Sequence, residues 1–267
     1  STIENIINIV EVKRTKKKIN KEPVKEKKRL KKNKKEVKIY GVYDPADNDF
    51  DLNMWSSTKA EDVKASLKRL EKVKLSKTAH EIFERIILSF AYAPSGMKEE
   101  EFADLKIDWL IKNQRSNLIE TFLKQNNEFK SKSRAVKYLV DENIAKANIK
   151  KGCEKIKFID EKIKDSYLEK FKIYCLIYND KKTAANLLFD ILKEQGLSDN
   201  FFNNKINYLL GFVDKPNNKI KDDNLLNFYL SSVTVPDFKY EPNDKTNKYI
   251  WDYLNAANLV KIDNVED

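Results

Sequence analysis

The chain has 267 residues, of which 41% are hydrophobic and 35% charged, so it can bury a substantial core. With 5 Gly and 6 Pro, its composition disfavours turn-rich β architectures, leaves no room for a Gly-rich phosphate loop and favours helices. The net charge of +10 is concentrated in residues 11–38, which hold 15 Lys or Arg against 4 Asp or Glu, whereas the remaining residues hold 37 against 38.

The chain starts with a short stretch rich in Ile and Val over residues 1–12, followed by a dense Lys run over 13–38. Few apolar side chains and high like charge predict a flexible Lys-rich tail over 1–40. An alternative function is binding of nucleic acid or an anionic membrane surface, with candidate contacts Lys16, Lys17, Lys18, Lys27, Lys28 and Arg29. No aromatic residue interrupts the run, so base stacking has no platform there.

Residues 41–56 are rich in Asp and Asn and are expected to form a loop segment. From residue 57 onward, apolar residues recur at helical spacing, with no run of 18 that would span a membrane. The pattern predicts a helical-repeat domain over 57–233, then an irregular segment and a C-terminal helix over 234–267. The expected helices cover about 59–73, 76–92, 98–112, 115–125, 133–140, 143–159, 166–178, 182–195, 200–211, 222–232 and 248–260.

The clearest of these units is a helical hairpin over residues 166–196, with a polar turn at 179–181. A short polar loop makes the two helices antiparallel, and Gly196 is a typical C-terminal signal. We expect Leu188 to lie in the core of this hairpin. The two predicted inward faces consist of Tyr167, Leu168, Phe171, Tyr174, Cys175 and Tyr178, and of Ala184, Leu187, Leu188, Ile191 and Leu192.

The first helices of successive pairs are predicted to begin near residues 98, 133, 166 and 200. These starts are 35, 33 and 34 residues apart, and a period near 34 is typical of stacked helix pairs. The sequence therefore predicts an all-α fold, an α-solenoid of antiparallel helix hairpins.

This spacing resembles that of the tetratricopeptide α-solenoids. The residues that carry the resemblance are Leu168, Phe171, Tyr174, Ala184, Leu187, Leu188 and Leu192. That family's Trp and Leu-Gly pair on the first helix are missing, as is the Pro that closes each repeat. The segment 191–196, ILKEQG, also resembles the LLxxQG-like repeat end of uncharacterised exported helical-repeat proteins of alphaproteobacteria. These resemblances imply a fold and no activity.

No residue pattern indicates a catalytic centre. His80 is the only histidine, so any Ser-His-Asp or Cys-His arrangement must be built around it, and a helix-surface or partly buried role is predicted instead. One His and two Cys offer no zinc-ligand spacing. Acidic pairs such as Asp104 and Asp108 would serve a hydrolase or transferase, but a solvated helix face is the simpler interpretation. We expect no enzyme activity, no cofactor and no metal.

The function that fits best is a non-enzymatic scaffold or adaptor that binds another protein or peptide on a helical-repeat surface. Fold-level analogy is the main support for this expectation. Most of the tyrosines and phenylalanines fall at core spacing, so packing explains them. Tyr138, Tyr174 and Tyr178 are the candidate residues for the alternative, a concave helical surface on which a peptide binds.

Cys153 and Cys175 lie on successive predicted helices on either side of a loop near residues 160–164. Antiparallel packing would bring them level, so a disulfide and two reduced core cysteines both remain open. An even cysteine pair, a first residue other than Met and a Lys- and Pro-containing spacer slightly favour an exported, periplasmic location over a cytoplasmic one.

Overall fold

The structure is a computed structural model, and it describes residues 37–126, 128–160 and 163–260. The chain divides into two units, Ser1–Ile39 and Tyr40–Asp267. The predicted anionic-partner residues Lys16, Lys17, Lys18, Lys27, Lys28 and Arg29 lie outside the described residues. The first unit ends at Ile39, one residue before the predicted end of the tail, and Tyr40 is buried in the second unit.

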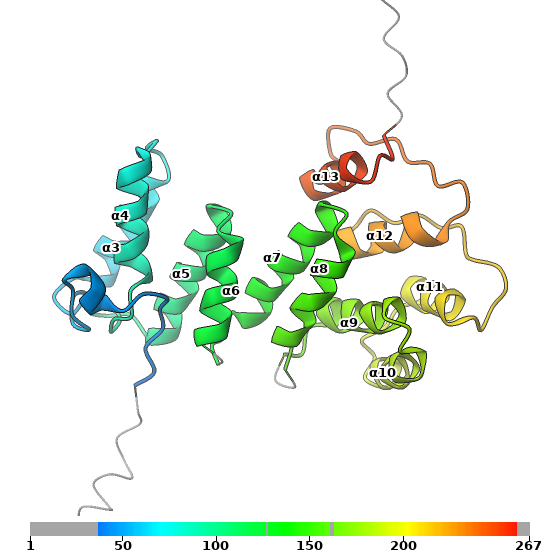
Figure 1. The fold of residues 1–267 in the computed structure, drawn as a ribbon, viewed down its shortest axis with the longest axis horizontal. Coiled ribbons are helices and arrows are strands. Elements are labelled where there is room, and N and C mark those ends of the chain that lie inside the picture. Colours follow the sequence, from blue (N-terminus) through cyan, green and yellow to red (C-terminus); the bar gives the residue numbers. More distant parts are fainter. Residues whose placement is uncertain (1–36, 127, 161–162, 261–267) are drawn as a thin grey trace, which may run out of the picture. The chain divides into compact units, whose positions relative to one another are not determined.

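The described part of the chain is all-helical, as predicted, and contains no named strand (Figure 1). None of its helices is long and apolar enough to cross a membrane. A 3-10 helix, η1 (Pro45–Asn48), comes first, and a second, η2 (Lys155–Phe158), follows α8. The α-helices are α3 (Ala60–Leu70), α4 (Lys77–Leu88), α5 (Glu99–Lys112), α6 (Ser116–Gln125), α7 (Lys132–Ala145), α8 (Ile149–Glu154), α9 (Ser166–Tyr178), α10 (Lys182–Glu194), α11 (Asn200–Leu210), α12 (Leu225–Thr234) and α13 (Lys248–Ala256).

Helix starts recur at a nearly constant interval. Helices α5, α7, α9 and α11 begin at Glu99, Lys132, Ser166 and Asn200, and helices α6, α8 and α10 begin at Ser116, Ile149 and Lys182. Both series advance by about 34 residues per step, which is the length of one stacked helix pair. We call this interval the helix-pair period. It breaks at α12, because α12 and α13 pack against α7 instead of continuing the series (Figure 1).

The connections inside three successive helix pairs share one backbone arrangement. Gln114, Ala147 and Asp180 recur at the helix-pair period and adopt φ of 54°, 51° and 57°. The N–H of each donates to a carbonyl three residues back, and the N–H of the next residue donates to a carbonyl five back. These are the two hydrogen bonds of a Schellman motif, which normally has Gly at the left-handed position. Each pair therefore reverses direction through a backbone-determined turn.

The left-handed turn at Ala147 supports a stability prediction. A residue with a Cβ is strained by about 1–2 kcal/mol in this conformation. Gly removes the strain, but it also makes the unfolded chain more flexible, which offsets part of the gain in stability. We expect Ala147→Gly to raise the free energy of unfolding by about 0.5–1 kcal/mol, measured by urea denaturation. The matched control is Ala184→Gly, at an exposed helical position, which should cost about 1 kcal/mol. Destabilisation by both substitutions would contradict the assignment of strain to this turn.

Two details of the helices differ from the sequence-based expectations. Helix α7 runs through the expected break at 140–143, and the second helix of its pair is the short α8 followed by η2. On α10, Ala185, Phe189 and Leu192 are buried, whereas Leu187 is 62% exposed and Leu188 half-buried. Because the large Phe189 ring packs against Phe202, the covered face is rotated from the predicted one, and Leu188 packs at the edge of the core instead of inside it.

An extended segment at the start of the unit runs along the residues that follow α4. The N–H of Val42 donates to Leu88 O over 2.7 Å, and the N–H of Phe90 donates to Tyr43 O over 2.9 Å. Gly41 is required here, since a Cβ would lie 2.6 Å from Phe90 N. The amide of Asn126 pairs with both backbone groups of Gly41, at 2.8 and 3.3 Å. The predicted loop 41–56 therefore starts as a buried, hydrogen-bonded segment.

Lys106 of α5 holds this segment in place. Its side chain is fully buried, and its Nζ donates to Tyr40 O over 2.6 Å and to Ser89 O over 2.9 Å. The ammonium also lies 4.4 Å from the centre of the Phe102 ring. Burial lowers the pKa of Lys106 to about 7, because the charged form loses its hydration. Two carbonyl groups that are buried at the start of the unit thus depend on one lysine.

Lys106 should make the stability of the protein depend on pH. Because its folded pKa lies below the unfolded value of 10.5, its contribution is full above about pH 10.5 and is lost as the pH falls toward 7. Between about pH 7.5 and 9.5, this group should add up to about 1.4 kcal/mol of unfolding free energy per pH unit. Urea denaturation of Lys106→Met should show a flatter pH dependence and, at high pH, a loss of about 1–3 kcal/mol, since two buried carbonyls lose their donor. Parallel pH curves for both proteins would refute this account.

Candidate protein-binding groove between α3, α4 and α5

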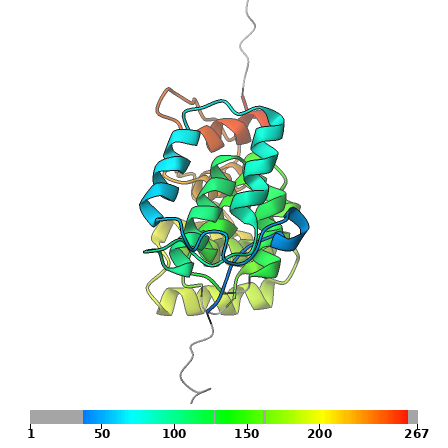
Figure 2. The same ribbon diagram turned by 90° about the vertical axis from the view of Figure 1, so that its left-hand side faces the viewer.

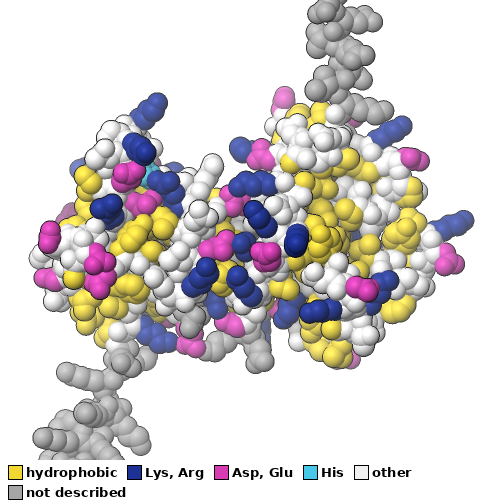
Figure 3. All heavy atoms as spheres, in the orientation of Figure 1, with side chains coloured by type: hydrophobic (Ala, Val, Ile, Leu, Met, Phe, Trp, Pro, Cys, Tyr) yellow, Lys and Arg dark blue, Asp and Glu magenta, His cyan; other side chains and the backbone are white. Residues whose placement is uncertain are grey.

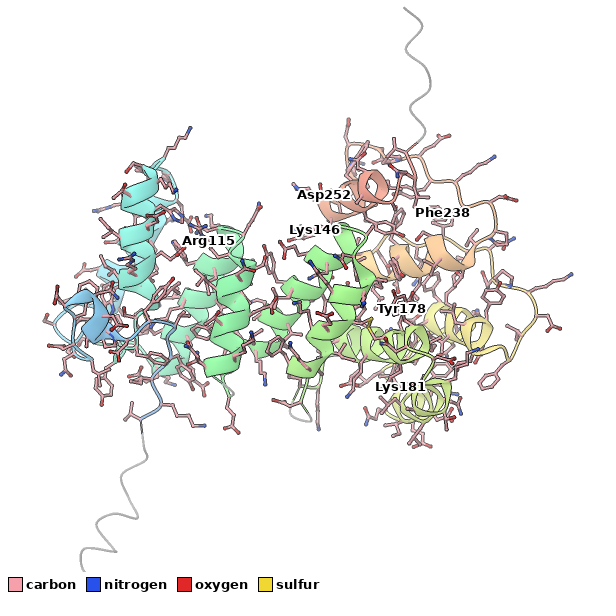
Figure 4. All side chains as sticks on the ribbon, viewed as in Figure 1. Arg115, Lys146, Tyr178, Lys181, Phe238 and Asp252 are labelled. Carbon is pink, nitrogen blue, oxygen red and sulfur yellow. A yellow bond between two sulfur atoms is a disulfide. The ribbon has the colours of Figure 1, made fainter. Side chains whose placement is uncertain are left out.

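The three tyrosines predicted to line a binding surface do not share an open face. Tyr138 and Tyr174 are buried, with 9% and 6% of their area exposed, and only Tyr178, labelled in Figure 4, is largely exposed. The Tyr174 hydroxyl lies 2.6 Å from that of Tyr229 on α12. Burial raises the pKa of Tyr249 on α13 to about 12, and the electrostatic effect of Tyr138 adds to the rise. Tyr138 and Tyr174 therefore lie in the packed interior beneath α13 and α12, and of the three predicted tyrosines Tyr178 alone is exposed.

Cys153 of α8 and Cys175 of α9 form a disulfide in the structure. Their Cα atoms are 5.4 Å apart, a usual separation for such a bridge. Both side chains are buried. The bridge joins one helix pair to the next, and it corresponds to the oxidised one of the two states that the sequence left open.

The disulfide should contribute to stability through the unfolded chain. Closing a loop across a separation of 22 residues is worth about 3 kcal/mol in the loop-entropy model. We expect a reductant to lower the melting temperature of the wild-type protein and to leave that of Cys153→Ser/Cys175→Ser unchanged. Thiol counting on denatured, unreduced protein should find no free thiol. Two free thiols per chain in protein taken from its native compartment would contradict the bridge.

An open groove of about 560 Å³ lies between α3, α4 and α5. Figure 2 looks onto this end of the unit, with α3 and α4 in front. The apolar part of the groove wall consists of Leu67, Leu70, Val73, Leu75, Phe83, Leu105 and Trp109. Charged side chains of both signs also line it, namely Lys64, Lys68, Lys112, Glu71 and Asp108.

The groove stays open because only one end of α3 is packed into the core. Ala60 and Val63, in its first turn, are buried, whereas Leu67 and Leu70 are half-buried. Val73, just beyond its C-terminus, is 58% exposed. The apolar stripe of α3 thus passes from the core to the groove along its length.

Polar contacts fix α3 beside α5. The ion pair Lys64–Glu101 has an N–O distance of 2.5 Å, and Lys112–Glu71 has one of 2.7 Å. At the start of α3, the N–H of Ala60 donates to Ser95 O over 2.9 Å. Both ion pairs are exposed and contribute little energy each, so they set geometry more than stability. They leave the apolar side chains between the helices uncovered.

His80 belongs to the wall of this groove. Its ring centre lies 5.2 Å from that of Trp109, whose ring also packs against Phe83 at 5.9 Å. An Arg can only donate hydrogen bonds, so the 3.1 Å contact from Arg115 makes His80 Nδ1 an acceptor. His80 Nε2 then carries the proton and donates to Asn113 Oδ1 over 3.0 Å. Both ring nitrogens have partners, so the arrangement fixes the ring rather than activating a nucleophile.

Arg115, labelled in Figure 4, connects two neighbouring helix pairs. Its Nε lies 2.8 Å from Glu84 Oε2 of α4, while its Nη2 contacts the His80 ring. Asp104 and Asp108, the acidic pair noted in the sequence, make similar connections. Asp104 accepts from Ser131 and Asp108 pairs with Arg134 at 2.8 Å, so both join α5 to the α7 region. These carboxylates are therefore engaged in packing between helices.

The surface around the groove carries both signs of charge. Figure 3 shows Lys and Arg side chains interspersed with Asp and Glu over the face that it presents, with hydrophobic side chains between them. This mixture matches the near-neutral charge of the chain outside residues 11–38. The geometry suits burial of apolar side chains from a partner, with a polar rim of either sign.

In comparisons with known proteins, no family model matches this chain, and neither a curated protein nor a solved structure matches it.

Proposed function

We propose that this protein is a non-enzymatic scaffold or adaptor that binds another protein in the groove between α3, α4 and α5. The observation that carries the proposal is the uncovered apolar wall of that groove, about 560 Å³ in volume. An amphipathic helix of a partner would bury its apolar stripe against Leu70, Val73 and Trp109, which is helix-in-groove recognition. The charged rim would hold the polar flanks of that helix.

The architecture proposed for the scaffold is an α-solenoid of antiparallel hairpins that resembles the tetratricopeptide type. Its support is the helix-pair period and the recurring Schellman turns. Ion pairs from one pair of helices to the next add to it. Examples are Lys64–Glu101, Lys155–Glu120 and Lys170–Asp199.

Panning a library of displayed helical peptides against the full chain tests the groove. Val73→Asp places a charge on the apolar wall at a position that is already 58% exposed, so the fold should persist. We expect the selected peptides to have apolar residues at i, i+3, i+4 and i+7 and to bind Val73→Asp at least about tenfold more weakly. The matched control is Phe212→Asp, which changes a side chain that is 61% exposed and outside the groove.

Equal binding of the selected peptides to the wild-type and Val73→Asp proteins would overturn the groove as the binding site. A loss of binding with Phe212→Asp alone would move the site to another face. Circular dichroism and thermal melting of each variant check that the fold is retained.

A second candidate function is binding of nucleic acid or an anionic membrane surface through residues 13–38. The observation that favours it is the charge of the segment 11–38, 15 Lys or Arg against 4 Asp or Glu. Titration of DNA and of vesicles with anionic lipid, with and without residues 1–38, tests it. Binding should weaken as salt rises and disappear in the shortened chain.

The disulfide supports a location in an oxidising compartment, because such bridges persist in exported proteins and are rare in the cytosol. A periplasmic or otherwise exported location remains the proposal, and the thiol count described above tests it as well.

A further inference from the structure

The turn that joins α3 to α4 carries an excess of positive charge. Residues 68–77, KRLEKVKLSK, hold five Lys or Arg against one Glu, in a chain that is nearly neutral outside residues 11–38. Lys and Arg side chains are visible at the upper end of α3 and α4 in Figure 3. We call the five cations the basic rim, and all of them are exposed: Lys68, Arg69, Lys72, Lys74 and Lys77.

The basic rim adjoins the groove between α3, α4 and α5. Lys68 lines that groove, and Val73 and Leu75 of the same segment belong to its apolar wall. Among the described residues, Lys68 has no ion-pair partner, and neither have the other four cations of the rim. Every other charged side chain of the groove lining is paired, in Lys64–Glu101, Lys112–Glu71 and Arg134–Asp108. The charge that the groove leaves unpaired is therefore positive.

Local helix stability does not account for the whole basic rim. Lys68 and Arg69 lie in the last turn of α3, where cations interact favourably with the helix dipole. Lys77 lies in the first turn of α4, where a cation is unfavourable, and that turn holds no acidic residue. Repulsion among five neighbouring cations adds to the cost. A bound anionic group would relieve both effects.

Apolar and basic side chains alternate in this segment, which favours a polypeptide as the ligand. Val73 is 58% exposed, and Leu70 and Leu75 are half-buried beside it. Duplex DNA would neutralise the cations and leave this apolar area in water. An amphipathic helix with acidic side chains covers the apolar area and neutralises the cations together.

A second copy of the chain does not offer such a helix in the part that the structure describes. Of the described α-helices, only α5 has a net negative charge, and none of its apolar residues is largely exposed. The exposed apolar pair Leu187 and Ile191 lies on α10, in which two Lys balance one Asp and one Glu. The described helices thus contain no complement to the rim, and the acidic helix is assigned to another protein.

We propose that the partner helix of the groove is acidic, with Asp or Glu side chains at one end that pair with the basic rim while its apolar stripe covers Leu70, Val73 and Trp109. This inference rests on the proposed function, because it assigns the chemistry of the ligand to the same groove. Exposed ion pairs contribute little affinity each, so the rim acts mainly by raising the association rate and by disfavouring basic partners.

Panning of a displayed helical peptide library tests the charge of the ligand. The polar positions of the library contain acidic and basic residues at equal frequency, and the full wild-type chain is the bait. The peptides kept for sequencing are those whose binding is weakened by Val73→Asp. We expect Asp and Glu to outnumber Lys and Arg at least about threefold at one end of these peptides.

The variant Lys68→Glu/Lys77→Glu reverses two charges of the rim. Its fold should persist, because the gain from an acidic residue in the first turn of α4 offsets the cost of one in the last turn of α3. We expect the association rate of the selected peptides to fall at least about fivefold with little change in their dissociation rate, and added salt to lower the wild-type rate as well.

The matched control is Lys181→Glu/Lys182→Glu, at exposed positions where α10 begins; Figure 4 labels Lys181. It changes the net charge of the chain equally and should leave the association rate within about twofold, since screening weakens distant charges. Equal loss of rate in both double variants would indicate a general charge effect and contradict the role of the rim.

The remaining outcomes separate this inference from the function on which it rests. Peptides that are sensitive to Val73→Asp but carry both signs equally would overturn the acidic ligand and retain the groove. Absence of any such peptide would overturn the groove and this inference with it. Binding of duplex DNA that Lys68→Glu/Lys77→Glu weakens and the control does not would make nucleic acid the ligand of the rim. The composition of the peptides selected on the wild-type chain decides the matter even if a double variant unfolds.

Discussion

Packing around α7 is the constraint on which the rest of the unit depends. Eight of its fourteen residues are buried, including Ala135, Val136, Leu139 and Ile144, and α5, α6, α8, α9, α12 and α13 all contact it. A helix that is apolar on most sides must be surrounded, and the chain supplies neighbours from both directions. The pairs before and after α7 follow the helix-pair period, while the last two helices return to close the remaining side. Interruption of the series at α12 is thus a consequence of the apolar surface that α7 and α9 present.

Local signals in the sequence were sufficient to locate most of the helix starts, although not the boundary between α7 and α8. The expected starts near 98, 133, 166 and 200 lie within one residue of α5, α7, α9 and α11, because apolar spacing and polar turns are properties of short segments. The predicted inward face of α10 differs from the buried one, because the buried face depends on the contact of Phe189 with Phe202 of another helix. The choice between core packing and an open surface for Tyr174 depends on tertiary structure at longer range. Burial of Tyr174 requires Tyr229, which is 55 residues away and reaches it only because the chain folds back.

Buried lysines were beyond a prediction from sequence. In a chain with 52 Lys and Arg, each lysine is expected at the surface, yet Lys106 and Lys205 are almost fully buried. Each of them donates to a carbonyl of a segment without regular structure, Lys106 to Tyr40 and Lys205 to Asn217. Tyr40 is buried, and a buried carbonyl outside a helix needs a donor, which the long side chain of Lys106 supplies from a neighbouring helix; Asn217 lies at the surface, and Lys205 reaches it from the core. The need arises from tertiary structure, so no spacing in the sequence indicates it.

The two ends of the described unit meet the same physical requirement in different ways. A helix pair has an apolar face that its own two helices do not fully cover, so something else must cover it or the face stays exposed. Around α7 and α9, the chain provides the cover itself, and Tyr253 and Leu254 of α13 are buried in that contact. Around α3 and α4, nothing among the described residues fills the space between Val73 and Trp109. The side chains of this open wall still expose part of their area, with Val73 at 58%, and a partner helix would remove that area from water. The cover that α13 provides within the chain is the physical model for the partner proposed for the open groove, a short helix that is apolar on one side and polar on the other.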